Sequence, residues 1–117
     1  MATAHLLIVD DESALAALLK KYMERLGYQV EACTHPQQVL AFLDADPTRY
    51  ALLVTDFTLP AMNGEELVQH ARERTPALPA IIVSGYPYEP RLPGVEFLQK
   101  PFIPKMLADV VERILSA

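Results

Sequence analysis

The chain has 117 residues, a hydrophobic fraction of 51%, a charged fraction of 21% and a net charge of −5, a balance that excludes intrinsic disorder and predicts one globular domain over residues 1–117. Its single cysteine excludes an intramolecular disulfide, and no apolar stretch approaches the roughly 20 residues that span a bilayer. Without a basic cluster or a signal-peptide pattern, we expect a cytoplasmic protein with no membrane partner and no direct nucleic-acid partner.

In the first half of the chain, apolar runs alternate with amphipathic stretches. The run His5–Val9 predicts a strand buried on both faces, and apolar residues spaced by three and four predict a helix over 11–26. Alternation over Tyr28–Cys33 predicts a second strand. Thr34 as the cap and Pro36 just inside the start predict a second helix.

The second half continues this alternation, with one gap. We expect strands over 51–55, 80–83 and 95–99, a helix over 65–74 and a final helix over 103–115. Strands that alternate with helices are typical of an α/β fold with a parallel sheet. Five strands in this length favour the flavodoxin-like order 2-1-3-4-5, with helices on both faces, over a barrel of about twice the length.

The gap lies between the fourth and fifth strands, where a crossover helix belongs. Pro87, Pro90 and Pro93 each remove a backbone donor and bias the preceding residue away from the α region. We therefore expect this helix to be missing or reduced to a turn. Ten extended residues reach roughly 33 Å, which is enough to return along one strand.

Polar residues follow four of the predicted strands, at the edge where ligands bind in such sheets. They are Asp10, Asp11, Asp56, Ser84 and Lys100. Three clustered carboxylates repel one another, and Mg²⁺, which prefers oxygen ligands, relieves that repulsion. A carboxylate is also a nucleophile toward phosphorus, and a lysine neutralises the transferred group. The cluster predicts Mg²⁺-dependent phosphoryl transfer onto an aspartate. Asp10 and Asp11 alone would suit helix capping equally well.

The motifs at these strand ends resemble the receiver domains of two-component response regulators over nearly the whole chain. The matching runs are Val9-Asp10-Asp11-Glu12, Asp56 to Gly64, Ser84-Gly85 and Lys100-Pro101-Phe102. Each run alone is weak, whereas all four in order, each at a strand end, are specific. The run from Phe97 to Phe102 also resembles receivers attached to hybrid histidine kinases.

The resemblance implies a role for each matching position. Asp56 would accept the phosphoryl group, and Asp10, Asp11, Asp56 and the backbone carbonyl of Thr58 would hold Mg²⁺. Lys100 would pair with the carboxylate before phosphorylation and with the phosphate after it. A cis peptide bond between Lys100 and Pro101 would place the lysine correctly. Ser84 and Phe97 would form the conformational switch, and Thr58 and Tyr86 would set the lifetime of the phosphate.

The resemblance also implies partners. The donor would be a histidine kinase or a histidine phosphotransfer protein, and the protein would catalyse only its own phosphorylation and dephosphorylation. Without the crossover helix, the family's usual dimer face is altered, so we expect a monomer or a weak dimer. Since the chain ends soon after the final helix, we expect no output domain.

Two other functions compete with a receiver. One is an aspartyl-phosphate phosphatase or phosphotransferase of the haloacid-dehalogenase kind, but Thr58 stands where those enzymes have their second acid, and no cap domain fits this length. The other is a pseudo-receiver that binds partners without phosphorylation. It would lack the acceptor or the lysine, and both Asp56 and Lys100 are present.

Overall fold

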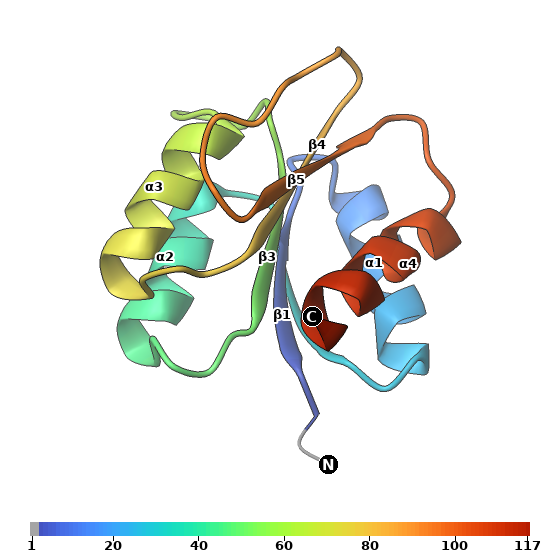
Figure 1. The fold of residues 1–117 in the computed structure, drawn as a ribbon, viewed down its shortest axis with the longest axis horizontal. Helices are drawn as coiled ribbons and strands as arrows, with labels where there is room; N and C mark the ends of the chain where they lie inside the picture. The colour runs from blue at the N-terminus through green and yellow to red at the C-terminus, as the bar shows by residue number, and fades with distance from the viewer. Residues whose placement is uncertain (1–2) are drawn as a thin grey trace.

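The computed structural model describes residues 3–117, whose five strands form one parallel sheet (Figure 1). The strands are β1 (His5–Val9), β2 (Gln29–Cys33), β3 (Leu52–Asp56), β4 (Ala80–Ser84) and β5 (Val95–Gln99). The helices are α1 (Ser13–Arg25), α2 (Pro36–Ala45), α3 (Gly64–Arg74) and α4 (Pro104–Ser116). The sheet order β2-β1-β3-β4-β5 confirms the predicted α/β topology.

Helices cover both faces of the sheet, so the central strands are buried on both sides. Figure 1 shows α2 and α3 on one face and α1 and α4 on the other. Along β1, Leu7 and Val9 belong to the cluster under α2 and α3, whereas Leu6 and Ile8 belong to the cluster under α1 and α4. This two-sided burial explains why the strands are continuously apolar in sequence.

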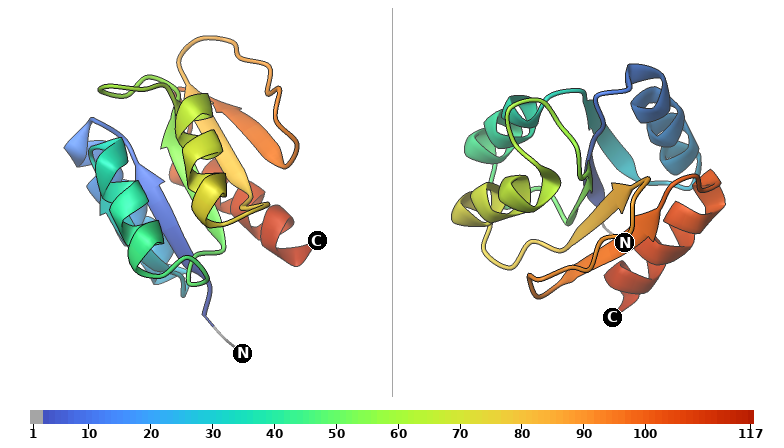
Figure 2. Two further views of the ribbon diagram at one scale, coloured as in Figure 1. Left: turned by 90° about the vertical axis from the view of Figure 1, so that its left-hand side faces the viewer. Right: turned by 90° about the horizontal axis from the view of Figure 1, so that it is seen from above.

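No helix lies between β4 and β5, which confirms the interpretation of the three prolines. Residues 85–94 instead form an irregular crossover segment, the orange trace at the top of Figure 1 and of the left view of Figure 2. Half-buried Tyr88 and Leu92 pack against the same cluster as α2 and α3. The segment therefore covers the part of the sheet that α3 leaves open, with two side chains in place of a helix.

The predicted cap of α2 is wrong by one residue. The N-cap is His35, whose Nδ1 accepts a hydrogen bond from the backbone N–H of Gln37 at 3.2 Å. Gln38 completes the cap, since its Oε1 accepts from the backbone N–H groups of both Thr34 and His35. A histidine ring nitrogen can serve as the cap acceptor here because the geometry needs only a lone pair near the helix start.

Candidate functional site

The carboxyl ends of β1 and β3 bring three acidic side chains together. One carboxylate oxygen from each of Asp10, Asp11 and Asp56 lies within 4.8 Å of those from the other two. Asp10 and Asp56 are 2% and 8% exposed, whereas Asp11 faces solvent. The register places them there, because β1 and β3 are paired neighbours that end at the same edge.

Lys100, just past the end of β5, joins two of these carboxylates. Its Nζ lies 2.9 Å from Oδ2 of Asp10 and 3.0 Å from Oδ2 of Asp56. Burial acts to lower the pKa of Lys100, but its bonds to the two carboxylates outweigh that effect and raise it. The peptide bond between Lys100 and Pro101 is cis.

The pKa of Asp56 is raised despite this lysine. Burial is the largest cause, because it disfavours the charged form, and the charge of Asp10 adds to it. The Lys100 ammonium and a backbone N–H of Thr58, 3.4 Å from Oδ1 of Asp56, act in the opposite direction. Asp56 is therefore a poorly solvated carboxylate with one oxygen bound to a cation.

Residues 57–63, named here the acceptor loop, connect Asp56 to α3. The backbone N–H of Gly64 donates to the Phe57 carbonyl at 2.7 Å, and Thr58 pairs with Asn63 in an antiparallel bridge. Asn63 caps α3 in a reciprocal pair with Glu66. These bonds close the loop at its base and thereby fix the position of Thr58 beside Asp56.

The remaining predicted residues lie at the end of β4, in the crossover segment and on β5. Ser84 is 5% exposed, and its Oγ accepts from the backbone N–H of Tyr86 at 3.1 Å, which leaves its own hydrogen free to donate. Tyr86 itself is 80% exposed, so its ring stands in solvent in this conformation. Phe97 is half-buried on β5.

Tyr88 contacts the residues that flank the acceptor loop, although no motif in the sequence pointed to it. Its hydroxyl donates to a carboxylate oxygen of Glu65 in α3, and its ring lies 4.9 Å from that of Phe57 and 6.0 Å from that of Phe97, measured between centroids. Spacing alone gave no signal for it, because Glu65 and Phe57 lie far from Tyr88 in sequence, with 23 residues between the positions of Glu65 and Tyr88.

The carboxylate oxygens of this cluster suit a hard divalent cation as ligand atoms. Three carboxylates meet with one ammonium as the counter-charge, and among residues 3–117 the Asp11 side chain forms no ion pair. All the side-chain donors are oxygens, which Mg²⁺ prefers. Asp10, Asp11 and Asp56 are thus the residues available to hold Mg²⁺.

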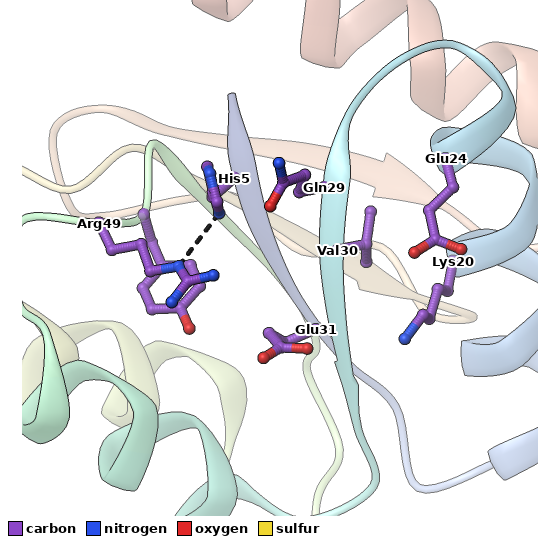
Figure 3. A pocket seen from close by; sticks show the side chains of 8 residues that line it. His5, Lys20, Glu24, Gln29, Val30, Glu31 and Arg49 are labelled. Carbon is purple, nitrogen blue, oxygen red and sulfur yellow. Dashed lines mark hydrogen bonds between the residues drawn. The ribbon is translucent and has the colours of Figure 1, made fainter. Parts of the chain in front are cut away.

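A hollow of about 350 Å³ lies at the other end of the strands (Figure 3). Its walls carry both charge signs, and Arg49 Nε donates to Nδ1 of His5 at 3.1 Å. His5 begins β1, whereas Asp10 follows the last residue of that strand. The hollow is therefore separate from the acidic cluster. Among residues 3–117, no helix is long and apolar enough to cross a membrane.

Comparison with known proteins points to one family. The model of the response regulator receiver domain matches residues 6–112. The response regulator RppA of Synechocystis sp. is 31% identical over 116 residues, covering 93% of this chain and 48% of RppA. The response regulator SaeR of Staphylococcus aureus is 27% identical over 118 residues, covering 96% of this chain and 50% of SaeR.

The solved structures agree with the sequence matches. The receiver domain of the hybrid histidine kinase CckA is 28% identical and superposes with a TM-score of 0.87, covering 96% of this chain and 99% of that one. A receiver domain from Methanospirillum hungatei is also 28% identical, with a TM-score of 0.83, and covers 98% and 96% of the two chains. The chain spans about half the length of the curated relatives it matches.

Proposed function

The chain belongs to the response regulator receiver family of two-component signalling, and on that premise we propose that Asp56 accepts a phosphoryl group in a Mg²⁺-dependent reaction. The observation that carries this proposal is the grouping of Asp56 with two further carboxylates and the Lys100 ammonium. No other carboxylate among residues 3–117 lies in such a cluster.

In the proposed step, an Oδ atom of Asp56 attacks the phosphorus of a phosphohistidine. A new O–P bond forms, the P–N bond breaks, and its electron pair leaves with the imidazole, which takes up a proton. Lys100 stays within reach of Asp56 and places its positive charge beside the transferred group. Bound by Asp10, Asp11 and Asp56, Mg²⁺ would supply further neutralisation of the phosphoryl oxygens.

The finer assignments are part of the same proposal. The backbone carbonyl of Thr58 contributes to the metal site, Ser84 and Phe97 report the phosphorylated state, and Thr58 and Tyr86 control how fast it decays. The family supports a histidine kinase or a histidine phosphotransfer protein as the donor. Residues 1–117 act as one cytoplasmic receiver domain, monomeric or weakly dimeric, which catalyses only its own phosphorylation and dephosphorylation.

The alternatives have less support. A haloacid-dehalogenase-like phosphatase needs a second acid two residues after its nucleophile, and Thr58 occupies that position. A pseudo-receiver would lack the acceptor or the lysine, whereas Asp56 and Lys100 are both present and hydrogen-bonded to each other.

Labelling with radioactive acetyl phosphate tests the proposal and needs no partner protein. We expect one base-labile phosphoryl group per chain in the presence of Mg²⁺ and none after chelation. Asp56→Asn abolishes labelling, while Asp109→Asn, which removes an exposed carboxylate from α4, leaves it unchanged. Continuous turnover of the donor would favour the phosphatase, no labelling would favour the pseudo-receiver, and labelled Asp56→Asn would refute the acceptor assignment.

A further inference from the structure

Tyr88 contacts both sides of the base of the acceptor loop. Its ring packs at 4.9 Å between centroids on Phe57, the first residue of the loop. Its hydroxyl donates a hydrogen bond to Glu65, two residues after the loop ends. A single side chain from the crossover segment therefore links the two chain segments whose separation defines the loop.

The loop base determines where Thr58 stands relative to Asp56. The Gly64-to-Phe57 hydrogen bond of 2.7 Å and the Thr58–Asn63 bridge hold the base as one unit. The backbone N–H of Thr58 reaches Oδ1 of Asp56 at 3.4 Å, near the limit of a hydrogen bond. At that length, a small displacement of the base decides whether this bond persists.

No helix connects β4 to β5, so the crossover segment is the part of this connection that packs beside the acceptor loop. Tyr88 and Leu92 are the apolar residues of the crossover segment that pack against the cluster under α2 and α3. The same segment is tied at its start to Ser84, through the Tyr86 N–H that donates to Ser84 Oγ at 3.1 Å. The crossover segment therefore contacts both the acceptor loop and the Ser84 hydroxyl at the end of β4.

Building on the proposed function, we propose that Tyr88 is a positioning residue for phosphoryl transfer, which holds the acceptor loop in place beside Asp56 through Glu65 and Phe57. The hydroxyl is suited to this role because it remains a donor at neutral pH. Burial, followed by the hydrogen bond to Glu65 and its charge, raises the pKa of Tyr88 to about 12.

Tyr88→Phe tests this directly, because it keeps the ring on Phe57 and removes only the hydroxyl. We expect the rate of labelling by acetyl phosphate to fall about three- to tenfold, the scale of one hydrogen bond, with the final stoichiometry unchanged. In the metal-free protein, the amide resonances of Thr58 and Asn63 shift. Leu92→Ala is the matched control: it loosens the same segment, lowers stability, and leaves the labelling rate within about twofold of wild type.

Glu65 variants provide a second, independent arm. Glu65→Ala should reproduce Tyr88→Phe, whereas Glu65→Gln, which keeps a hydrogen-bond acceptor, should stay closer to wild type. The double variant Tyr88→Phe/Glu65→Ala should be no slower than either single variant, since both remove the same contact. If Tyr88→Phe does not fold, the contrast between Glu65→Ala and Glu65→Gln decides.

Three results would overturn the proposal: a wild-type labelling rate with unshifted Thr58 resonance in Tyr88→Phe, an equal loss in Leu92→Ala, or equal rates in the two Glu65 variants. Failure of the proposed function looks different, because the wild-type protein itself would then take up no label on Asp56. The amide resonances would still report whether Tyr88 positions the loop.

Discussion

Gly64 lies directly against the backbone of Asp56. A methyl group in place of one Gly64 hydrogen would stand 2.6 Å from the Asp56 carbonyl oxygen and 3.1 Å from the Cα of Phe57. Both neighbours are backbone atoms, so neither can rotate away. The first residue of α3 is thus glycine because the helix approaches the candidate acceptor more closely than any side chain permits.

Gly64→Ala should therefore lower the free energy of unfolding by about 1–3 kcal/mol, the usual cost of forcing an extra carbon into a packed site. Urea denaturation measures it. Gly85→Ala is the matched control, because an added Cβ there meets no atom within 4 Å, and we expect a change below about 0.5 kcal/mol. Equal effects of the two substitutions would show that the close approach does not constrain the helix.

Asp56→Asn should stabilise the metal-free protein at neutral pH by about 1 kcal/mol, because the folded state no longer holds a poorly solvated charge. The folded pKa of Asp56 is raised, so the wild-type penalty exists above that pKa and disappears as the pH falls through it. Urea denaturation with a chelator at pH 7 and at pH 3 measures both limits. Asp11→Asn is the control, because it removes an equal charge from an exposed position. If it stabilises the protein as much as Asp56→Asn does, the effect comes from repulsion among the three carboxylates and not from burial of Asp56.

Asp11→Ala should weaken Mg²⁺ binding more than Asp10→Ala. Asp10 already accepts hydrogen bonds from Lys100 Nζ at 2.9 Å and from the backbone N–H of Glu12 at 2.9 Å, whereas Asp11 is solvent-exposed. Loss of a carboxylate from a site with few protein ligands should cost about tenfold or more in affinity. Isothermal titration calorimetry measures this, and equal losses would contradict the ranking.

Thr58→Asn and Tyr86→Ala should each shorten the lifetime of the phosphorylated protein. Neither native residue is a base for the attacking water, whereas the asparagine amide can orient it and the alanine leaves it unobstructed. We expect decay to accelerate about two- to tenfold, the scale of one hydrogen bond. Decay is followed after removal of acetyl phosphate. Since Tyr86 is 80% exposed, an effect of Tyr86→Ala requires its ring to move over the phosphate. Unchanged decay in both variants would exclude the idea that these two side chains shield the phosphate from water.

Cys33 should be unreactive in the native protein. It is 1% exposed, and burial, with a smaller effect from the charge of Glu31, raises the pKa of its thiol to about 11. At pH 8 a disulfide reagent should react at least about 100-fold more slowly than in denaturant, because little thiolate forms. The raised pKa also means that stability falls as the pH rises from about 9 to 11, a loss that Cys33→Ala removes. Rapid native labelling would contradict this.

The parts of the site that follow from strand order were predictable from sequence. Asp10, Asp56 and Lys100 each follow a predicted strand, and a parallel sheet brings the carboxyl ends of its strands to one edge. The absent helix was equally predictable, since three prolines act locally on the backbone.

Contacts set by tertiary packing were not predictable. The hydrogen bond from Tyr88 to Glu65 depends on how an irregular segment folds back over the sheet, which no periodicity encodes. The closeness of Gly64 to Asp56 depends on the angle at which α3 approaches the end of β3, which the sequence does not specify. The cap at His35 was missed because propensity ranks threonine higher and a ring nitrogen served instead.

The short connection between β4 and β5 has a consequence for how the chain finds its fold. Residues 85–94 close this strand pair, whereas residues 57–79 separate β3 from β4. The entropic cost of closing a loop rises with the logarithm of the loop's length. Closing the connection between β4 and β5 therefore costs about 0.7 kcal/mol less than closing the one between β3 and β4. Its three prolines restrict the unfolded chain further. Pairing of β4 with β5 thus has the lowest closure cost of the strand pairings in the sheet, and the same pairing brings Lys100 to Ser84, whose carbonyl accepts from the Lys100 backbone N–H at 2.8 Å.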